Sequence, residues 1–111
     1  MRISKDLVAA SATPIVLGVL ASGEDYGYSI LRRIKDASGG SLDWSEGMLY
    51  PLLHRLERQG LIEAHWGKSE TGRRRKYYAI TSAGISELHG QAAALDVVAT
   101  TLKGLLPRSN S

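Results

Sequence analysis

The sequence predicts a mainly α-helical protein with a small β-hairpin, arranged as a winged helix-turn-helix with a long helix at its C-terminal end. Three observations support this fold class. Three helical segments come first in the 111-residue chain, and glycine-containing turns separate them. The spacing of apolar residues then changes from about 3.6 to about 2 at Ile62, which is the change from helix to strand. A last apolar pattern of helical spacing follows the hairpin and continues almost to the end of the chain.

Composition sets the limits within which any function must fall. A chain of 111 residues with 43% hydrophobic side chains is long enough for one packed domain. Its formal net charge is only +3, so nucleic-acid binding would depend on where the charges lie. The chain has no cysteine, which excludes disulfides, thiolate catalysis and cysteine metal sites. A reducing compartment fits this composition, and we expect a cytoplasmic protein.

The N-terminal segment predicts a short helical arm over residues 3–11 and then a separate helix. Thr13 followed by Pro14 is typical of an N-cap and the first residue of a helix, which we expect to end near Ala21. A secretory signal is the alternative for this segment, but polar residues and the proline interrupt its apolar stretch. The uninterrupted apolar run is also far shorter than the roughly 20 residues needed to cross a membrane.

Two further helices are expected between residues 27 and 59. Residues 23–25 predict a turn, and residues 27–37 carry apolar side chains at helical spacing before a Ser-Gly-Gly stop. Ser45 then predicts the N-cap of a third helix that reaches about Gln59 and stops at Gly60. The predicted core face of this third helix consists of four leucines: Leu49, Leu52, Leu53 and Leu56.

The predicted hairpin follows directly. Alternating apolar residues over 62–66 indicate a half-buried strand, residues 67–73 a polar turn, and residues 74–80 the return strand. Both tryptophans, Trp44 and Trp66, are expected to pack in the core or at a hinge. Three helices and a hairpin in this order are typical of a winged helix-turn-helix, whose third helix enters the DNA major groove.

The charges of the hairpin are concentrated enough to indicate phosphate contact. Residues 68–76 contain five cations and one acid, a net charge of +4 that exceeds the charge of the whole chain. An ordinary solvated hairpin and a nuclear-targeting sequence are the alternatives for this stretch. The candidate phosphate-binding residues are Lys68, Arg73, Arg74, Arg75 and Lys76.

The third helix carries candidate DNA-binding residues on the side opposite its leucines. Ser45 and the free N–H groups at the helix start favour a phosphate, and Gly47 lets DNA approach closely. We expect Tyr50 to bond phosphate or pack on sugar, and His54 and Arg55 to reach base edges.

Three segments, DYGYSILRRI, SEGMLYPLLHRLERQGLIEAHW and TGRRRKYYAITSAG, strongly resemble the PadR family of bacterial transcriptional regulators. The resemblance implies a dimeric winged-helix repressor that binds an inverted-repeat operator, typically released by an inducer or a stress signal. It also implies that the recognition helix is marked by Ser45, Gly47, Tyr50 and Pro51, and the wing by residues 72–76. Met48 stands where many members carry threonine, so we expect a hydroxyl contact to DNA to be missing and the DNA sequence that is read to differ.

Other functions receive less support from the sequence. The GKS at residues 67–69 lacks the preceding glycine and the following helix of a phosphate-binding loop. The three histidines lack metal-ligand spacing, and no serine has a credible histidine and acid partner, so we expect no metal, no cofactor and no enzyme. A winged-helix module that binds protein in a larger assembly is the alternative to a DNA-binding regulator. A small-molecule inducer is compatible with the resemblance, but the last helix has no aromatic residue that would indicate an aromatic compound.

The C-terminal segment predicts a dimerisation helix. Thr81 or Ser82 caps a helix that reaches about Leu106, and its apolar or small residues alternate by three and four as in a coiled coil. A helix that packs only on its own domain is the alternative. The chain therefore divides into residues 1–81, a winged-helix domain with an N-terminal arm, and residues 82–111, a dimerisation helix with a short tail. The predicted dimer interface comprises Leu7, Val8, Ile85, Leu88, Ala92, Leu95, Ala99, Leu102 and Leu106.

Overall fold

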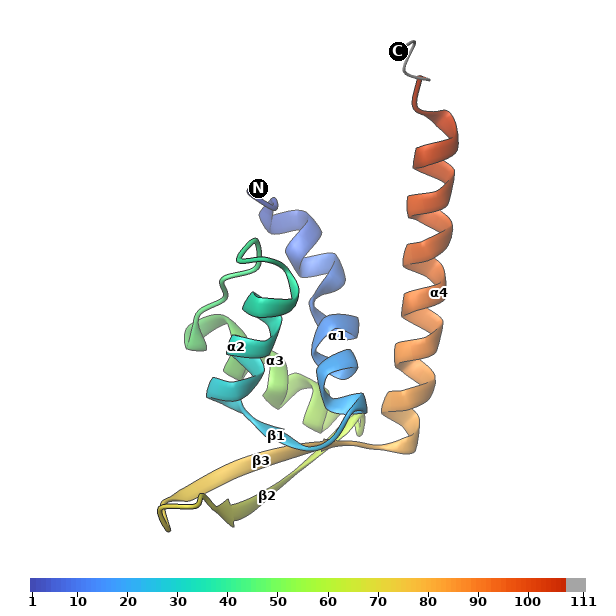
Figure 1. Ribbon diagram of the computed structural model, residues 1–111. Coiled ribbons are helices and arrows are strands. Elements are labelled where there is room, and N and C mark those ends of the chain that lie inside the picture. Colours follow the sequence, from blue (N-terminus) through green and yellow to red (C-terminus); the bar gives the residue numbers. More distant parts are fainter. Residues whose placement is uncertain (108–111) are drawn as a thin grey trace.

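Four helices and a three-stranded antiparallel sheet make up the fold (Figure 1). The structure is a computed structural model that describes residues 1–107, so most of the predicted C-terminal tail lies outside the described residues. The elements in chain order are α1 (Lys5–Ala21), β1 (Asp25–Tyr26), α2 (Gly27–Ala37), α3 (Glu46–Arg58), β2 (Ile62–Lys68), β3 (Arg74–Ile80) and α4 (Ser82–Leu105).

The core lies where α1, α2 and α3 pack on the inner end of the sheet. The four predicted leucines of α3 are all buried there, together with Trp44, which confirms both predictions. Tyr78 of β3 is 1% exposed and is the largest fully buried side chain. Burial raises the pKa of its hydroxyl, and the neighbouring Tyr50 and Glu57 raise it further. The sheet is thus fixed to the helices by a neutral aromatic side chain.

The first 21 residues form one helix, so the prediction of an arm followed by a separate helix is wrong. α1 is capped by Ser4 and continues through Pro14, and Thr13 is a helical residue rather than an N-cap. The proline removes one backbone donor, but the Ala10 carbonyl that loses its partner belongs to an exposed residue and can be solvated. Ala12 is buried against the core, and this packing favours a continuous helix.

β3 is the central strand and pairs with β1 on one side and β2 on the other. The register places Tyr78 opposite Ala64 and Lys76 opposite Trp66. Because side chains alternate across a strand, the sheet face that is buried at Tyr78 continues outward as the face of Lys76. Strand β2 extends to Lys68, two residues beyond the predicted end.

β1 is a strand that the sequence did not predict, since Asp25 was expected to lie in a turn. The Asp25 carboxylate is buried and accepts hydrogen bonds from the Tyr26 N–H at 2.9 Å and the Ser29 hydroxyl at 2.8 Å. Arg33 donates to the same carboxylate at 3.3 Å. These contacts fix the start of α2 against the sheet, which local propensity alone does not specify.

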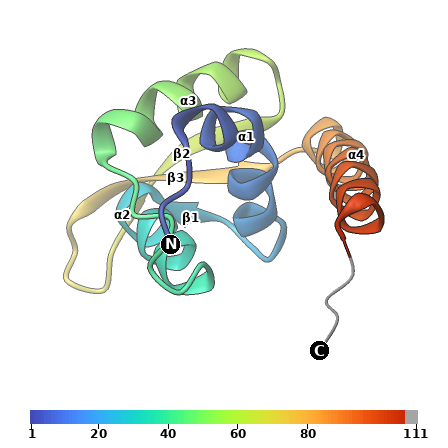
Figure 2. The same ribbon diagram turned by 90° about the horizontal axis from the view of Figure 1, so that it is seen from above.

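α4 begins against the domain and then leaves it. The Thr81 hydroxyl accepts from the Gly84 N–H at 3.1 Å and donates to the Gly60 carbonyl at 2.7 Å, which confirms Thr81 as the cap. Leu88 packs against the domain core, but every described residue from Ala92 onward is exposed. Figures 1 and 2 show α4 beside α1 at its start and rising past the domain at its C-terminal end. None of the described helices combines the length and apolar character needed to span a bilayer.

We expect Gly84→Ala to destabilise the fold. A Cβ at this position would clash with the Leu61 carbonyl oxygen and with Ile80. The added atom must displace backbone, so the free energy of unfolding should fall by about 1–3 kcal/mol in urea or thermal unfolding. Gly90→Ala on the same helix is the matched control, because nothing lies within 4 Å of its added Cβ and alanine favours a helix by about 1 kcal/mol. Equal stability of the two variants would contradict the close approach of α4.

Candidate nucleic-acid interface

A cleft of about 690 Å³ opens between the β2–β3 hairpin and the exposed side of α3. We call this hairpin, residues 62–80, the wing. The start of α2 closes the cleft on its third side, so three elements that are distant in sequence meet around it. Its lining residues are Tyr26, Gly27, Tyr28, Tyr50, His54, Trp66, Arg73, Arg74, Arg75, Lys76 and Tyr78.

The start of α3 presents free backbone donors, although no residue of α3 before Tyr50 lines the cleft. The Ser45 hydroxyl accepts from the Met48 N–H at 3.2 Å, which confirms the predicted cap. Ser45, Gly47 and Pro51 are exposed, so the first turns of α3 offer a surface with small side chains. Met48 differs from the prediction, because its side chain is half-buried and packs against the core.

Tyr50 connects α3 to α2 rather than standing free on the surface. It is half-buried, and its hydroxyl lies so close to Gly27 that a Cβ there would clash with it. The absence of a side chain at Gly27 therefore makes room for the ring at the floor of the cleft. His54, one turn further along α3, is exposed and lines the same cleft.

The wing divides its cations between two faces. Arg74 and Lys76 share one face with Trp66, because Lys76 lies directly opposite Trp66 in the register. Arg75 lies on the other face, with its guanidinium carbon 4.1 Å from the centre of the Tyr26 ring. None of the five predicted wing cations forms an ion pair within residues 1–107. The positive charge of the wing is thus available to an anionic partner.

Six of the predicted DNA-binding residues do not line the cleft: Ser45, Gly47, Met48, Pro51, Arg55 and Lys68. Arg55 turns toward α1, where its guanidinium donates to the Thr13 hydroxyl at 3.2 Å. It does not line the cleft with His54, as the sequence-based prediction of base-edge contact would require. Lys68 pairs with Arg74 in the sheet at the outer end of the wing and lines a neighbouring surface pocket.

Aromatic side chains support the face of the wing that carries Arg75. Tyr77 packs edge-on against Tyr26, with ring centres 5.7 Å apart, and stacks on His65 at 5.9 Å. The His65 ring in turn contacts Glu24 at 3.0 Å. Gly67 is needed at this point, because a Cβ there would lie 2.9 Å from the Tyr77 ring. This stack stiffens the wing where it leaves the core.

Five lining residues were not among the predicted site residues: Tyr26, Gly27, Tyr28, Trp66 and Tyr78. Trp66 was expected to pack in the core or at a hinge, but 58% of its surface is exposed. The period-2 pattern of the hairpin does place Trp66 on the face of Lys76. The same pattern would have predicted Trp66 as an interface residue if the strand had been expected to extend beyond the core.

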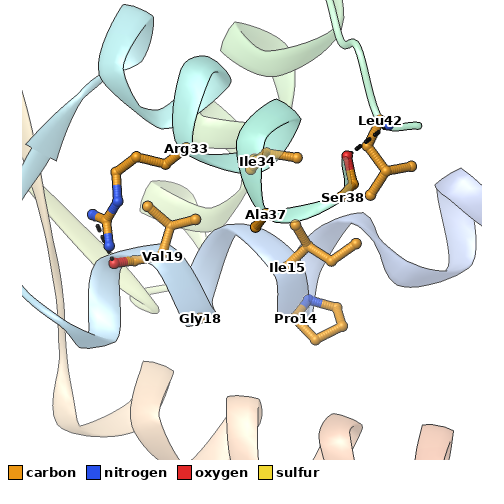
Figure 3. Close-up of a pocket in the computed structure, with 9 residues that line it drawn as sticks. All are labelled: Pro14, Ile15, Gly18, Val19, Arg33, Ile34, Ala37, Ser38 and Leu42. Atoms are coloured by element: carbon orange, nitrogen blue, oxygen red, sulfur yellow. Dashed lines mark hydrogen bonds between the residues drawn. The ribbon is translucent and has the colours of Figure 1, made fainter. Parts of the chain in front are cut away.

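An apolar pocket of about 440 Å³ lies between α1 and α2, away from the cleft (Figure 3). The charged group at one end, Arg33, already donates to the Val19 carbonyl and the Ser22 hydroxyl. The hydroxyl at the other end, Ser38, donates to the Lys35 carbonyl and accepts from the Leu42 N–H. The polar groups that line this pocket are therefore engaged within the domain, whereas the wing cations at the cleft form no ion pair in the described residues.

Comparison with known sequences identifies the family of this chain. The pattern of the transcriptional regulator PadR-like family matches residues 16–90, from the middle of α1 to the start of α4. The chain belongs to this family. An uncharacterised protein of Lysinibacillus sphaericus is 32% identical over 107 residues, which cover 93% of this chain and 98% of that protein. The negative transcriptional regulator PadR of Bacillus subtilis strain 168 is 32% identical over 74 residues, 67% of this chain but only 41% of that protein.

Solved structures of PadR-like regulators share the whole fold. A transcriptional regulator from Clostridium thermocellum superposes with a TM-score of 0.83 at 28% identity, covering 93% of this chain and all of that one. A PadR-like transcriptional regulator from Bacillus cereus strain ATCC 14579 gives the same TM-score at 30% identity, covering 95% of this chain and all of that one. Family membership implies DNA-binding regulation.

No group of three or more histidine, aspartate or glutamate side chains is arranged for a metal ion within residues 1–107. The chemistry of the cleft is that of aromatic rings and guanidinium and ammonium groups, which recognise anionic surfaces.

We expect Gly27→Ala to weaken DNA binding by displacing Tyr50. The Tyr50 hydroxyl must move, and the loss of one hydrogen-bonding group at the interface corresponds to roughly a two- to tenfold rise in Kd. Fluorescence anisotropy with a labelled duplex would measure the change. Tyr50→Ala should not add fully to Gly27→Ala if both act through the same ring. Gly18→Ala, with nothing within 4 Å of its added Cβ, is the control.

Proposed function

We propose that the protein is a homodimeric repressor that binds an inverted-repeat DNA operator in the cytoplasm and performs no catalysis. Each protomer would supply one reading head, made of α3 and the wing, for one half-site. The proposal is supported by family membership and by the similarity of the chain to a protein named as a negative transcriptional regulator.

The observation that carries DNA binding is the position of unpaired cations beside the exposed side of α3. Five cations with no ion pair in the described residues lie on a wing that shares one cleft with Tyr50 and His54. Phosphates would occupy the positions opposite the wing cations and the free N–H groups at the start of α3. This orientation directs His54 toward the major groove, where base edges are read.

In the same orientation, α3 and the wing would have different roles in DNA binding. The wing cations would contact phosphate and thus supply affinity with little sequence preference. Sequence preference would come from the exposed side of α3, where Tyr50 and His54 line the cleft. Gly47, which has no side chain, would let the DNA backbone approach the helix closely.

Dimerisation is supported by the apolar side of α4. The predicted interface residues of its second half are exposed, with 57% of the surface of both Leu102 and Leu106 accessible. Leu7 on α1 is 53% exposed as well. A helix of 24 residues is about 36 Å long, and no described part of the chain covers its C-terminal half. A second copy of the chain would bury this surface, with Leu88 and Val8 packing mainly within each protomer.

A dimer also meets the geometric demand of the operator. Two reading heads must lie about 34–36 Å apart to contact successive turns of the major groove on one side of the DNA. Since α4 leaves the domain on the side opposite the wing tip (Figure 1), a contact between α4 helices would hold both wings outward. A protein-binding module in a larger assembly is the alternative function, and it predicts no binding to duplex DNA at moderate salt.

Replacing Arg74 and Arg75 by alanine should weaken binding to every duplex by a similar factor. The plot of log affinity against log salt concentration should become less steep by about 0.9 for each phosphate that the variant no longer neutralises. Lys35→Ala is the control, because it also removes one positive charge at a single site. Lys35 lies in the last turn of α2 and pairs with Asp43, outside the wing. If the double variant kept its salt slope and changed only its preferred sequence, the assignment of the wing to phosphate would be wrong. Failure of the unaltered protein to bind duplex DNA would favour the protein-binding module.

A charge on the apolar side of α4 should separate the protomers. Leu102→Glu places a carboxylate in the proposed interface, and sedimentation should show monomers with reduced operator affinity. Because Leu102 is 57% exposed within the protomer, the domain itself should keep its melting temperature to within a few degrees. Thr100→Glu is the control, since about 100° per residue puts Thr100 about 160° around the helix from Leu102. A dimer that survives Leu102→Glu would show that the protomers meet elsewhere.

A further inference from the structure

An exposed tryptophan stands among the cations of the wing. Trp66 lies on β2 with 58% of its surface accessible, whereas Trp44 is buried. Its ring lines the cleft together with Tyr28, Tyr50 and His54. A large apolar side chain in this position adds nothing to the core, so its contact within the wing is the feature to explain.

The Arg74 guanidinium lies over this ring, 4.6 Å from its centre. The register explains why, because Trp66 is opposite Lys76 and Arg74 is two residues away on the same face of β3. Lys68 lies directly opposite Arg74 and carries the same charge. Like charges repel, and no acid pairs with them in residues 1–107, so the ring provides the attractive contact that orders Arg74.

Stacking of this kind leaves the donors of arginine free. A guanidinium over a ring uses its flat face, while its N–H groups point outward in the plane and match the two oxygens of a phosphate. No hydrogen bond within residues 1–107 engages the Arg74 guanidinium. An unsupported arginine would lose about 2 kcal/mol of rotamer entropy when it is fixed on a phosphate, and stacking removes part of that loss before DNA arrives.

We propose that Trp66 is a positioning residue for DNA binding, whose indole ring holds the Arg74 guanidinium ready for a backbone phosphate. The role rests on the proposed DNA-binding function and refines it. Arg75 is excluded from this unit, because it stacks on Tyr26 at the opposite face of the wing. The two arginines are therefore held separately rather than as one basic patch.

A double-mutant cycle on duplex binding tests the proposal. Trp66→Ala should raise Kd about two- to fivefold, the factor expected for an exposed cation–π contact. It should leave the salt slope unchanged, since the charge of Arg74 stays, whereas Arg74→Ala should lower both affinity and slope. The double variant Trp66→Ala with Arg74→Ala should bind no more weakly than Arg74→Ala alone. Trp66→Phe, which keeps a ring, should bind within about twofold of the unaltered protein.

Arg73 and Arg75 provide matched controls on the same wing. Their alanine variants should combine additively with Trp66→Ala, because neither guanidinium lies over the Trp66 ring. An additive effect with Arg74→Ala as well would overturn the proposal and indicate that Trp66 contacts DNA independently. A lower salt slope in Trp66→Ala would also overturn it, since that would indicate a disordered wing. If the unaltered protein bound no duplex, the proposed function would fail, which is a different result from normal binding with an additive cycle.

Discussion

The register of β3 against its neighbours is the constraint on which the interface depends. Tyr78 lies in the core, and the residues two and four positions earlier, Lys76 and Arg74, share its side of the sheet. A single face of one strand thus begins as core and ends as a basic, aromatic surface around Trp66. A shift of one residue would bring Tyr77 into the core and turn both cations away from α3. The pairing with β1 and β2 on both sides makes such a shift costly, because it would break both ladders at once.

Close contacts at positions without side chains transmit this register to the helices. Gly27 allows the Tyr50 ring to lie against the start of α2, and Gly84 allows α4 to start against the turn after α3. Asp25 ties the same start of α2 to β1 through its hydrogen bonds. The positions of α3, the wing and α4 are therefore all fixed relative to one sheet. Because Thr81 joins β3 to α4, a displacement of α4 in a dimer would also move the wing.

Charge and apolar surface are separated along the molecule. The wing concentrates a net charge of +4 over residues 68–76, while the whole chain carries only +3. The exposed apolar residues of α4, including Leu102 and Leu105, lie at the other end of a molecule that is 59 Å in its longest dimension. Electrostatic attraction to an anionic partner and hydrophobic association with a second copy can therefore proceed without competing for the same surface. This separation would suit the proposed dimer, in which each chain holds a second copy and DNA at the same time.

Local patterns in the sequence predicted the fold class, the caps at Ser45 and Thr81, the buried leucines of α3 and the two strands of the wing. Each of these depends on the spacing of apolar residues or on a capping residue, which neighbouring residues determine. Tertiary contacts settled what such patterns do not contain. Packing of Ala12 on the core made α1 continuous through a proline that locally signals a helix start. Pairing of distant segments created β1. Strand alternation, combined with where the core ends, divided Arg74, Arg75 and Lys76 between two faces and left Trp66 beside Arg74. These outcomes depend on contacts between residues that are far apart in the chain. A local sequence pattern does not specify which distant side chain will pack against a given residue.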